Sequence, residues 1–329
     1  MWRTFRAGSF HSAPGVNRNQ LSYYAERGQR IIGCGDGYTP DQTDYDPSHP
    51  FILSKRPNYP DHMTRKLKTA LKEWCRRAGI PVIGVAETSR WEKPPFTPWV
   101  PEPFYPHSIY PEARSVIVIG LPVHLPVIET TPSIYYHELY QTLNRLLDER
   151  SYQIAEWLNQ AGHPSIFVPR DGYGSIEVLL KNPVAFFSHR HAAYLSGLGT
   201  FGVNNMILTP GYGPRIRFGT VFTSAVLPPD PIMEEDLCIR CMRCVTMCPS
   251  RALPGEAYPE GITMKGACTQ YSAGLFRRSI SPCGICIKVC PVGADRAAFG
   301  RKDPDIYEKG NTPRDLAQAW DHVRAYGGS

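Results

Sequence analysis

Residues 238–249 read CIRCMRCVTMCP, and residues 283–291 read CGICIKVCP. The first run has three cysteines at every third position, then a fourth that is followed directly by proline. In two-cluster iron-sulfur proteins, three thiolates of such a run hold one 4Fe-4S cluster, and the cysteine before proline crosses to the other cluster. The second run has the same ending but one cysteine fewer. Together the two runs predict a pair of clusters, and hence the transfer of electrons.

Cys268 lies between the two runs and is the nearby cysteine that can complete the second set. The crossover rule then divides eight cysteines between two clusters. One cluster is assigned Cys238, Cys241, Cys244 and Cys290, and the other is assigned Cys268, Cys283, Cys286 and Cys248.

Zinc and disulfides are the competing interpretations of these cysteines. Cys-x2-Cys pairs also form structural zinc sites, but such sites rarely need three cysteines at this spacing and a crossover Cys-Pro. The chain opens MWRTFRAGSF, without the basic start and apolar core of an export signal and without a twin-arginine stretch. We therefore expect a reducing, cytoplasmic setting. Cys75 is interpreted as a packed or surface thiol, and Cys34 is assigned no role.

Length and composition indicate an ordinary globular protein with more than the cluster segment. The chain has 329 residues, 42% of them hydrophobic and 20% charged. Its net charge of +6 is compatible with an anionic partner such as RNA or an acidic redox protein, and equally with none. We expect an irregular extension (1–60), a body (61–229), a two-cluster domain (230–300) and a tail with a helix (301–329). No apolar stretch is long enough to cross a bilayer.

Periodicity in the body predicts alternating helices and strands. Apolar residues recur at helical spacing over 62–78 and over 134–161, the second helix with a break near Ser151. Strands are expected at 81–86, 115–120 and 165–168, and the β-branched run SVIVIG (115–120) is typical of a central strand buried on both faces.

Further along, residues 189–198 are expected to form a helix, and 207–210 with 216–227 a hairpin around the turn at 211–214. The proline-rich aromatic stretch 94–106 is either a lid over a flat ligand or a packed surface connection. The body is therefore predicted to have an α/β or α+β fold.

The body should hold the acceptor of the electrons: a flavin, a corrinoid, a further metal, or the docking surface of a partner protein. No Gly-x-Gly-x-x-Gly opens a helix after a strand, and no phosphate-binding Gly-Lys-Ser/Thr loop is present, which disfavours dinucleotide and ATP sites. The pair His189-x-His191 is only a weak metal motif.

Several segments occur in a familiar order: PEARSVIVIG (111–120), GLGTFG (197–202) with Asn204, LTPGYGPRIR (208–217) and VFT (221–223), followed by the cysteine runs. This series resembles the superfamily of epoxyqueuosine reductases and reductive dehalogenases. The resemblance implies a nitroreductase-like domain that binds cobalamin without a protein ligand to cobalt, beside a ferredoxin-like domain with two 4Fe-4S clusters. It places the corrinoid contacts at Gly197, Gly199, Gly202, Asn204 and Thr209, with a turn role as the alternative for Asn204.

Within this superfamily the segment 212–217 is more similar to the dehalogenases, where the arginine matching Arg215 would orient a substrate anion or halide. The second cysteine run ends Cys290-Pro291-Val-Gly, whereas epoxyqueuosine reductases usually have Cys-Pro-Trp-Asn. Against dehalogenation, the sequence lacks an export signal and the family's proton-donating tyrosine at the aligned place. The candidate proton donors are Tyr136, His137, His189 and His191. For the two latter histidines the alternative is a helix start capped by Ser188.

The resulting hypothesis is a cobalamin-dependent iron-sulfur reductase. A ferredoxin or flavodoxin would supply electrons, and a small organic molecule would be reduced, with reductive dehalogenation as one such reaction. The alternatives are an epoxyqueuosine reductase acting on transfer RNA and a corrinoid-free electron carrier.

Overall fold

The computed structural model describes residues 61–97, 99–170, 175–182 and 184–326. The expected N-terminal extension, with Cys34, lies outside the described residues. Asn58–Ser329 forms one compact unit. The boundaries expected near residues 229 and 300 fall inside this unit, so the separation into domains stays a prediction.

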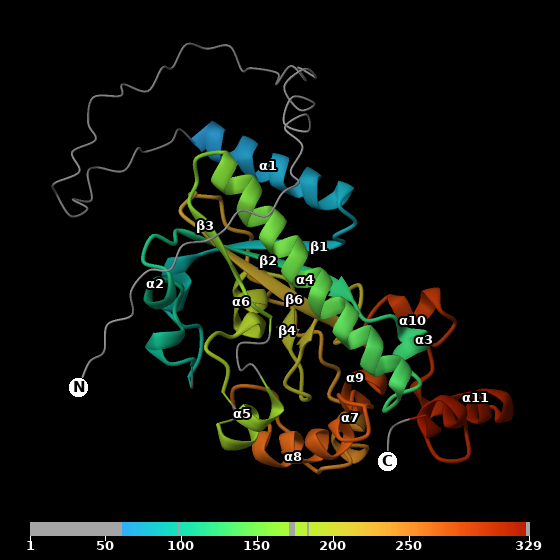
Figure 1. Ribbon diagram of the computed structural model, residues 1–329. Helices are drawn as coiled ribbons and strands as arrows, with labels where there is room; N and C mark the ends of the chain where they lie inside the picture. Colours follow the sequence, from blue (N-terminus) through green and yellow to red (C-terminus); the bar gives the residue numbers. More distant parts are fainter. Residues whose placement is uncertain (1–60, 98, 171–174, 183, 327–329) are drawn as a thin grey trace, which may run out of the picture. The chain divides into compact units, whose positions relative to one another are not determined.

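A four-stranded antiparallel sheet lies at the centre of this unit, as Figure 1 shows. Its order is β1 (Val82–Glu87), β2 (Ser115–Pro122), β6 (Ile216–Thr223) and β3 (Ser165–Val168). Seven of the eight residues of β2 are buried, and β2 pairs with β1 on one side and β6 on the other. The prediction of a central strand at SVIVIG is thus confirmed.

Helices cover both faces of the sheet. Along β2, Ile117 and Ile119 belong to the core cluster formed with α1 (Asp61–Arg77) and α4 (Ile134–Gln160). The alternate residues of β2 join a second core cluster, which includes α6 (His189–Leu195). This two-sided burial follows from the period of two along a strand, and it confirms a mixed helix and strand fold.

Shorter elements surround the sheet and form the cysteine-bearing part. The helices are α2 (Pro106–Ile109), α3 (Leu125–Ile128), α5 (Ile176–Lys181), α7 (Arg243–Thr246), α8 (Lys265–Phe276), α9 (Ile285–Lys288), α10 (Asp295–Ala298) and α11 (Arg314–Ala325). Single 3-10 turns occupy Thr88–Trp91, Glu102–Phe104 and Pro304–Tyr307, and β4 (Thr200–Phe201) pairs with β5 (Ile207–Leu208). Among the described helices, none combines the length and the apolar character that crossing a membrane requires.

Three expectations about these elements are wrong. The expected hairpin does not form, because β5 pairs with β4 while β6 pairs with β2 and β3. Helix α4 continues through Ser151 without a break; this side chain packs over Gly219, where a Cβ would lie 2.6 Å from the Ser151 hydroxyl. Helix α6 ends at Leu195, since Gly197 adopts a left-handed φ of +71° just beyond it.

Candidate functional site

The first cysteine group combines the loop before α7, α7 itself and the residue two positions after α9. Cys238, Cys241, Cys244 and Cys290 line one common cavity. Burial, together with charge repulsion from the other three thiols, raises the pKa of the Cys244 thiol to about 12. Met242, with a left-handed φ of 60°, turns the loop between two of them. The structure therefore brings together the four cysteines that the crossover rule assigns to one cluster.

The second group joins α8, the residue two positions after α7, the turn before α9 and α9 itself. Burial raises the pKa of Cys286, and repulsion from Cys283, Cys268 and Cys248 adds to the effect. Burial likewise raises the pKa of Cys283 to about 11, with Cys268 and Cys248 among its charged neighbours. The remote Cys268 thus lies where the sequence requires it to complete the set.

Each group offers four thiols, the ligand set of a 4Fe-4S cluster. A zinc ion draws its thiolates to about 2.3 Å from a single centre, whereas the iron atoms of a 4Fe-4S cube hold them farther apart. Across the described ranges, no group of three or more His, Cys, Asp or Glu side chains could hold a single metal ion. The backbone N–H of Ala252 also donates to the Cys248 sulfur at 3.3 Å, a contact that favours the thiolate form.

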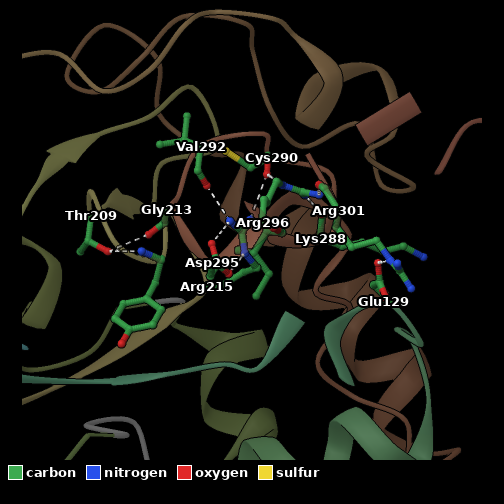
Figure 2. Close-up of polar contacts among 12 residues, drawn as sticks. Glu129, Thr209, Gly213, Arg215, Lys288, Cys290, Val292, Asp295, Arg296 and Arg301 are labelled. Atoms are coloured by element: carbon green, nitrogen blue, oxygen red, sulfur yellow. Dashed lines mark hydrogen bonds and ion pairs between the residues drawn. The ribbon is translucent and has the colours of Figure 1, made fainter. Parts of the chain in front are cut away.

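Arg215 contradicts the role expected for it. Its side chain is fully buried, and it points toward the loop after Cys290 (Figure 2). Nε and Nη2 donate to the two carboxylate oxygens of Asp295, each at 2.7 Å. The remaining N–H groups donate to the carbonyl oxygens of Ile287, Cys290 and Val292 at 3.2, 2.9 and 2.6 Å. All five donors of the guanidinium are used, so Arg215 anchors the Cys290 loop to the start of β6.

A second buried arginine at this loop was not predicted from the sequence. Arg296 is 2% exposed, and its Nε donates to the Cys290 carbonyl oxygen at 2.7 Å. Its other nitrogens donate to the carbonyl oxygens of Lys288 and Arg301 and to the Tyr307 hydroxyl. In the sequence, Arg296 stands out only by its position soon after Cys290-Pro291. That position does not predict which groups the guanidinium contacts.

The tail closes over the same region. Glu129, which follows α3 and is 2% exposed, accepts a hydrogen bond from Arg301 at 2.8 Å (Figure 2). It also accepts one from the Tyr307 hydroxyl at 2.7 Å. The amino group of Lys288 lies 5.1 Å from the centre of the Tyr307 ring and 4.9 Å from that of Trp320 on α11. Residues 301–320 are thereby attached both to the body and to the segment that carries Cys290.

The residues expected to contact a corrinoid instead contact the chain itself. A Cβ on Gly197 would lie 1.9 Å from the Pro231 carbonyl oxygen, and one on Gly199 would lie 1.9 Å from that of Leu208. At Gly202 the nearest atom would be the Asn204 side-chain oxygen, at 2.9 Å. These close approaches explain why glycine is needed at these positions even when no ligand is bound.

Asn204 and Thr209 are likewise occupied by nearby backbone. The Asn204 side-chain oxygen accepts from the N–H of Met206 at 3.1 Å, and its amide donates to the Cys286 carbonyl at 3.4 Å. The Thr209 hydroxyl accepts from the N–H of Tyr212 at 3.2 Å. Both are more than nine-tenths buried. These contacts support the turn role left open for Asn204, and corrinoid contacts from this set of residues stay a prediction.

Tyr136 and His137 lie beside the second cysteine group. Tyr136 is 3% exposed, and burial raises its pKa although the nearby Arg217 lowers it. A Cβ on Gly284 would lie 2.7 Å from the Tyr136 ring, which shows how closely the ring approaches the turn between Cys283 and Cys286. Nδ1 of His137 lies 2.6 Å from the Ser281 carbonyl oxygen. The two side chains are therefore placed next to a cluster site, and a role as proton donors stays a prediction.

His191 is held in an aromatic cluster. Its Nδ1 lies 2.7 Å from the Ser188 hydroxyl and its Nε2 lies 3.0 Å from the Tyr258 hydroxyl. Burial lowers the pKa of His191 to about 3, and the positive charge of Arg190 contributes. The imidazole is thus neutral near pH 7, which argues against it as a general acid.

The proline-rich stretch forms part of the same cluster. The Trp99 ring lies 4.7 Å from the His191 ring, and the Phe96 ring lies 5.3 Å from that of Tyr258. The stretch is therefore a packed connection in this structure rather than an open lid. His189 points elsewhere, with Nδ1 2.7 Å from the Thr220 hydroxyl on β6.

Comparison with known protein families identifies the cysteine-bearing segment. Residues 237–294 match the family model described as a 4Fe-4S dicluster domain. This span contains all eight cysteines of the two groups.

Curated relatives extend the similarity into the body. The tetrachloroethene reductive dehalogenase of Desulfitobacterium hafniense is 25% identical over 255 residues, covering 72% of this chain and 41% of that protein. The epoxyqueuosine reductase of Pseudomonas aeruginosa is 24% identical over 258 residues, covering 69% of this chain and 68% of that protein. The chain is a relative of both groups of reductases. It spans less than half the length of the dehalogenases that it matches.

A solved structure shows the same fold. A reductive dehalogenase, whose structure suggests a mechanism for B12-dependent dehalogenation, superposes with a TM-score of 0.52 at 17% identity. The superposition covers 80% of this chain and 36% of the dehalogenase. The expected architecture, a mixed helix and strand body with a two-cluster segment, is confirmed.

Proposed function

We propose that this protein is an oxidoreductase that passes electrons one at a time through two 4Fe-4S clusters to an acceptor at its body. The observation that carries the proposal is the gathering of eight cysteines, from segments up to 52 positions apart in the chain, into two groups of four. Such a cluster pair conducts electrons and does not itself perform organic chemistry. The reduced compound is therefore bound by residues of the body.

The two groups differ in what surrounds them. Exposure does not separate them, because each group has one exposed cysteine, Cys241 in the first and Cys268 in the second. In the second group, Cys286 and Cys283 lie near the buried Tyr136 of α4. We infer that electrons from a ferredoxin or flavodoxin enter at the first group and leave from the second, on the Tyr136 side.

A cobalamin is our candidate for the acceptor, because the related dehalogenase structure is described as B12-dependent. When bound, it would supply a strongly reducing metal centre. Its contacts would come from Gly197, Gly199, Gly202, Asn204 and Thr209, as the resemblance to the reductases implies. Tyr136 would exclude water from the space beside the second group through its buried ring.

Cofactor analysis of anaerobically reconstituted protein tests these proposals. We expect about eight iron atoms and eight sulfides per chain, since each cluster contributes four of each. Uptake of about one corrinoid per chain would support the cobalamin acceptor. Full iron loading without corrinoid would refute it and leave the protein a two-cluster electron carrier. Loading of one zinc per cysteine group would refute the proposed function altogether.

The substrate is proposed as a small organic molecule, with an organohalide as the first compound to assay. The alternative, epoxyqueuosine in transfer RNA, is favoured by the similarity to epoxyqueuosine reductases over 69% of the chain. Complementation of a strain that cannot reduce epoxyqueuosine separates the two. Restored queuosine would overturn the small-molecule proposal.

A further inference from the structure

The two arginines at the Cys290 loop differ in the charge that surrounds them. Arg215 forms a two-point ion pair with Asp295, so the pair is close to neutral. Arg296 has no such partner: within the described residues, each of its hydrogen bonds ends on a carbonyl or hydroxyl oxygen. A buried cation without a counter-ion is costly unless a negative group lies nearby.

The thiolates of the first cysteine group supply that negative charge. Arg296 and Arg215 both donate to the carbonyl oxygen of Cys290, at 2.7 and 2.9 Å, and hold this residue from two sides. A 4Fe-4S cluster with four thiolates is an anion, and reduction adds one more negative charge to it. A fixed positive charge in a poorly solvated site therefore stabilises the reduced state more than the oxidised state.

We propose that Arg296 is a positioning residue that raises the reduction potential of the cluster held by Cys238, Cys241, Cys244 and Cys290. Arg296 does so by supplying a buried positive charge that pairs directly with no carboxylate among the described residues, and by fixing the Cys290 backbone. The proposal rests on the presence of two clusters, as in the proposed function. Guanidinium groups stay protonated at any pH that proteins tolerate, so the effect is independent of pH.

Asp295 offers a second test, in which the reduction potential should shift in the opposite direction. It compensates the charge of Arg215, whose Nη1 reaches the same Cys290 carbonyl. Replacing Asp295 with asparagine leaves a similar shape but exposes the cluster to the full charge of Arg215. The D295N variant should therefore shift the potential in the direction opposite to that caused by losing Arg296.

Arg190 provides a matched comparison at the second group. Its guanidinium donates to the Asn205 side-chain oxygen at 2.7 Å, and Cys268 and Cys286 are among its charged neighbours. No ion pair with a carboxylate is found for Arg190 in the part of the chain that the structure describes. Loss of this cation should affect the other cluster.

The experiment is an anaerobic redox titration of the reconstituted holoprotein, followed by electron paramagnetic resonance, for the wild type and R296M, R296K, D295N and R190M variants. Iron and sulfide are measured first. A wild type without about eight iron atoms refutes the proposed function, whereas full loading leaves the potentials to decide this inference.

In R296M, the reduced-to-oxidised ratio of one cluster at a fixed potential should fall at least tenfold, which equals 59 mV for a one-electron couple. The other cluster should be unchanged. D295N should raise the reduced-to-oxidised ratio of the same cluster, and R190M should lower the ratio of the other cluster. R296K should stay near the wild type because lysine keeps the positive charge. Wild-type potentials in fully loaded R296M, or shifts of the same sign in R296M and D295N, would overturn the proposal. If R296M does not retain its clusters, the absence of an upward shift in D295N overturns it.

Discussion

Replacement of Arg215 by methionine is expected to destabilise the protein strongly. The substitution leaves Asp295 charged and buried, because Arg215 donates to both of its carboxylate oxygens and the carboxylate is nearly inaccessible to water. Breaking a buried ion pair by removing one partner costs about 3–5 kcal/mol. The carbonyl groups of Ile287 and Val292 also lose a donor, whereas Cys290 keeps its bond from Arg296. Because proteins are stable by only about 5–15 kcal/mol, this is a large fraction of the total.

Anaerobic urea denaturation, followed by tryptophan fluorescence and by the visible absorbance of the clusters, measures this effect. The matched control is R76M, which removes an arginine from the exposed ion pair with Glu73 on α1 and should not shift the midpoint measurably. The double variant R215M/D295L should recover part of the loss, since it removes the unpaired acid as well. An R215M midpoint equal to that of R76M would show that Arg215 does not anchor the loop.

Three further outcomes are expected. The C268S variant should lose about four iron atoms per chain, one cluster's complement, and C75S, a buried thiol outside both groups, should lose none. G197A should lower the melting temperature more than G79A, because both glycines have a left-handed φ (+71° and +72°) but only Gly197 has a backbone oxygen within 1.9 Å of the added Cβ; equal losses would exclude the steric contribution. Burial lowers the pKa of His191 to about 3, whereas the pKa of histidine in an unfolded chain is near 6.5. Between these two values the unfolded state binds more protons than the folded state, so stability falls as the pH drops below about 6.5. By pH 5.5 the loss should be about 1.4 kcal/mol relative to pH 7.5, and H191Q should remove this slope in urea titrations.

Local patterns in the sequence predicted the features that depend on local chemistry. The spacing of the cysteines limits which thiolates can reach one cluster, so both groups of four could be assigned from the order and spacing of the cysteines in the chain. The β-branched run at 115–120 predicted β2 for a similar reason, because such residues favour a strand that is buried on both faces.

Features that depend on distant partners could not be predicted in this way. The turn at 211–214 suggested a hairpin, yet β6 pairs with β2, about a hundred residues earlier in the chain. The motif around Arg215 resembled a substrate-binding segment, but the ion-pair partner of this arginine is 80 positions away. The glycines at 197–202 are needed for close backbone contacts, and a single sequence does not distinguish this need from contact with a cofactor.

The hydrogen bonds around Cys290 also bear on how the protein is made. Arg296 and Tyr307 follow the last of the eight cysteines in the chain. They therefore leave the ribosome after all eight cysteines have emerged from it. Cys290 gains its full set of backbone contacts only when this late segment has folded against Glu129. Insertion of the first cluster should consequently follow the synthesis and folding of the segment that carries Arg296 and Tyr307.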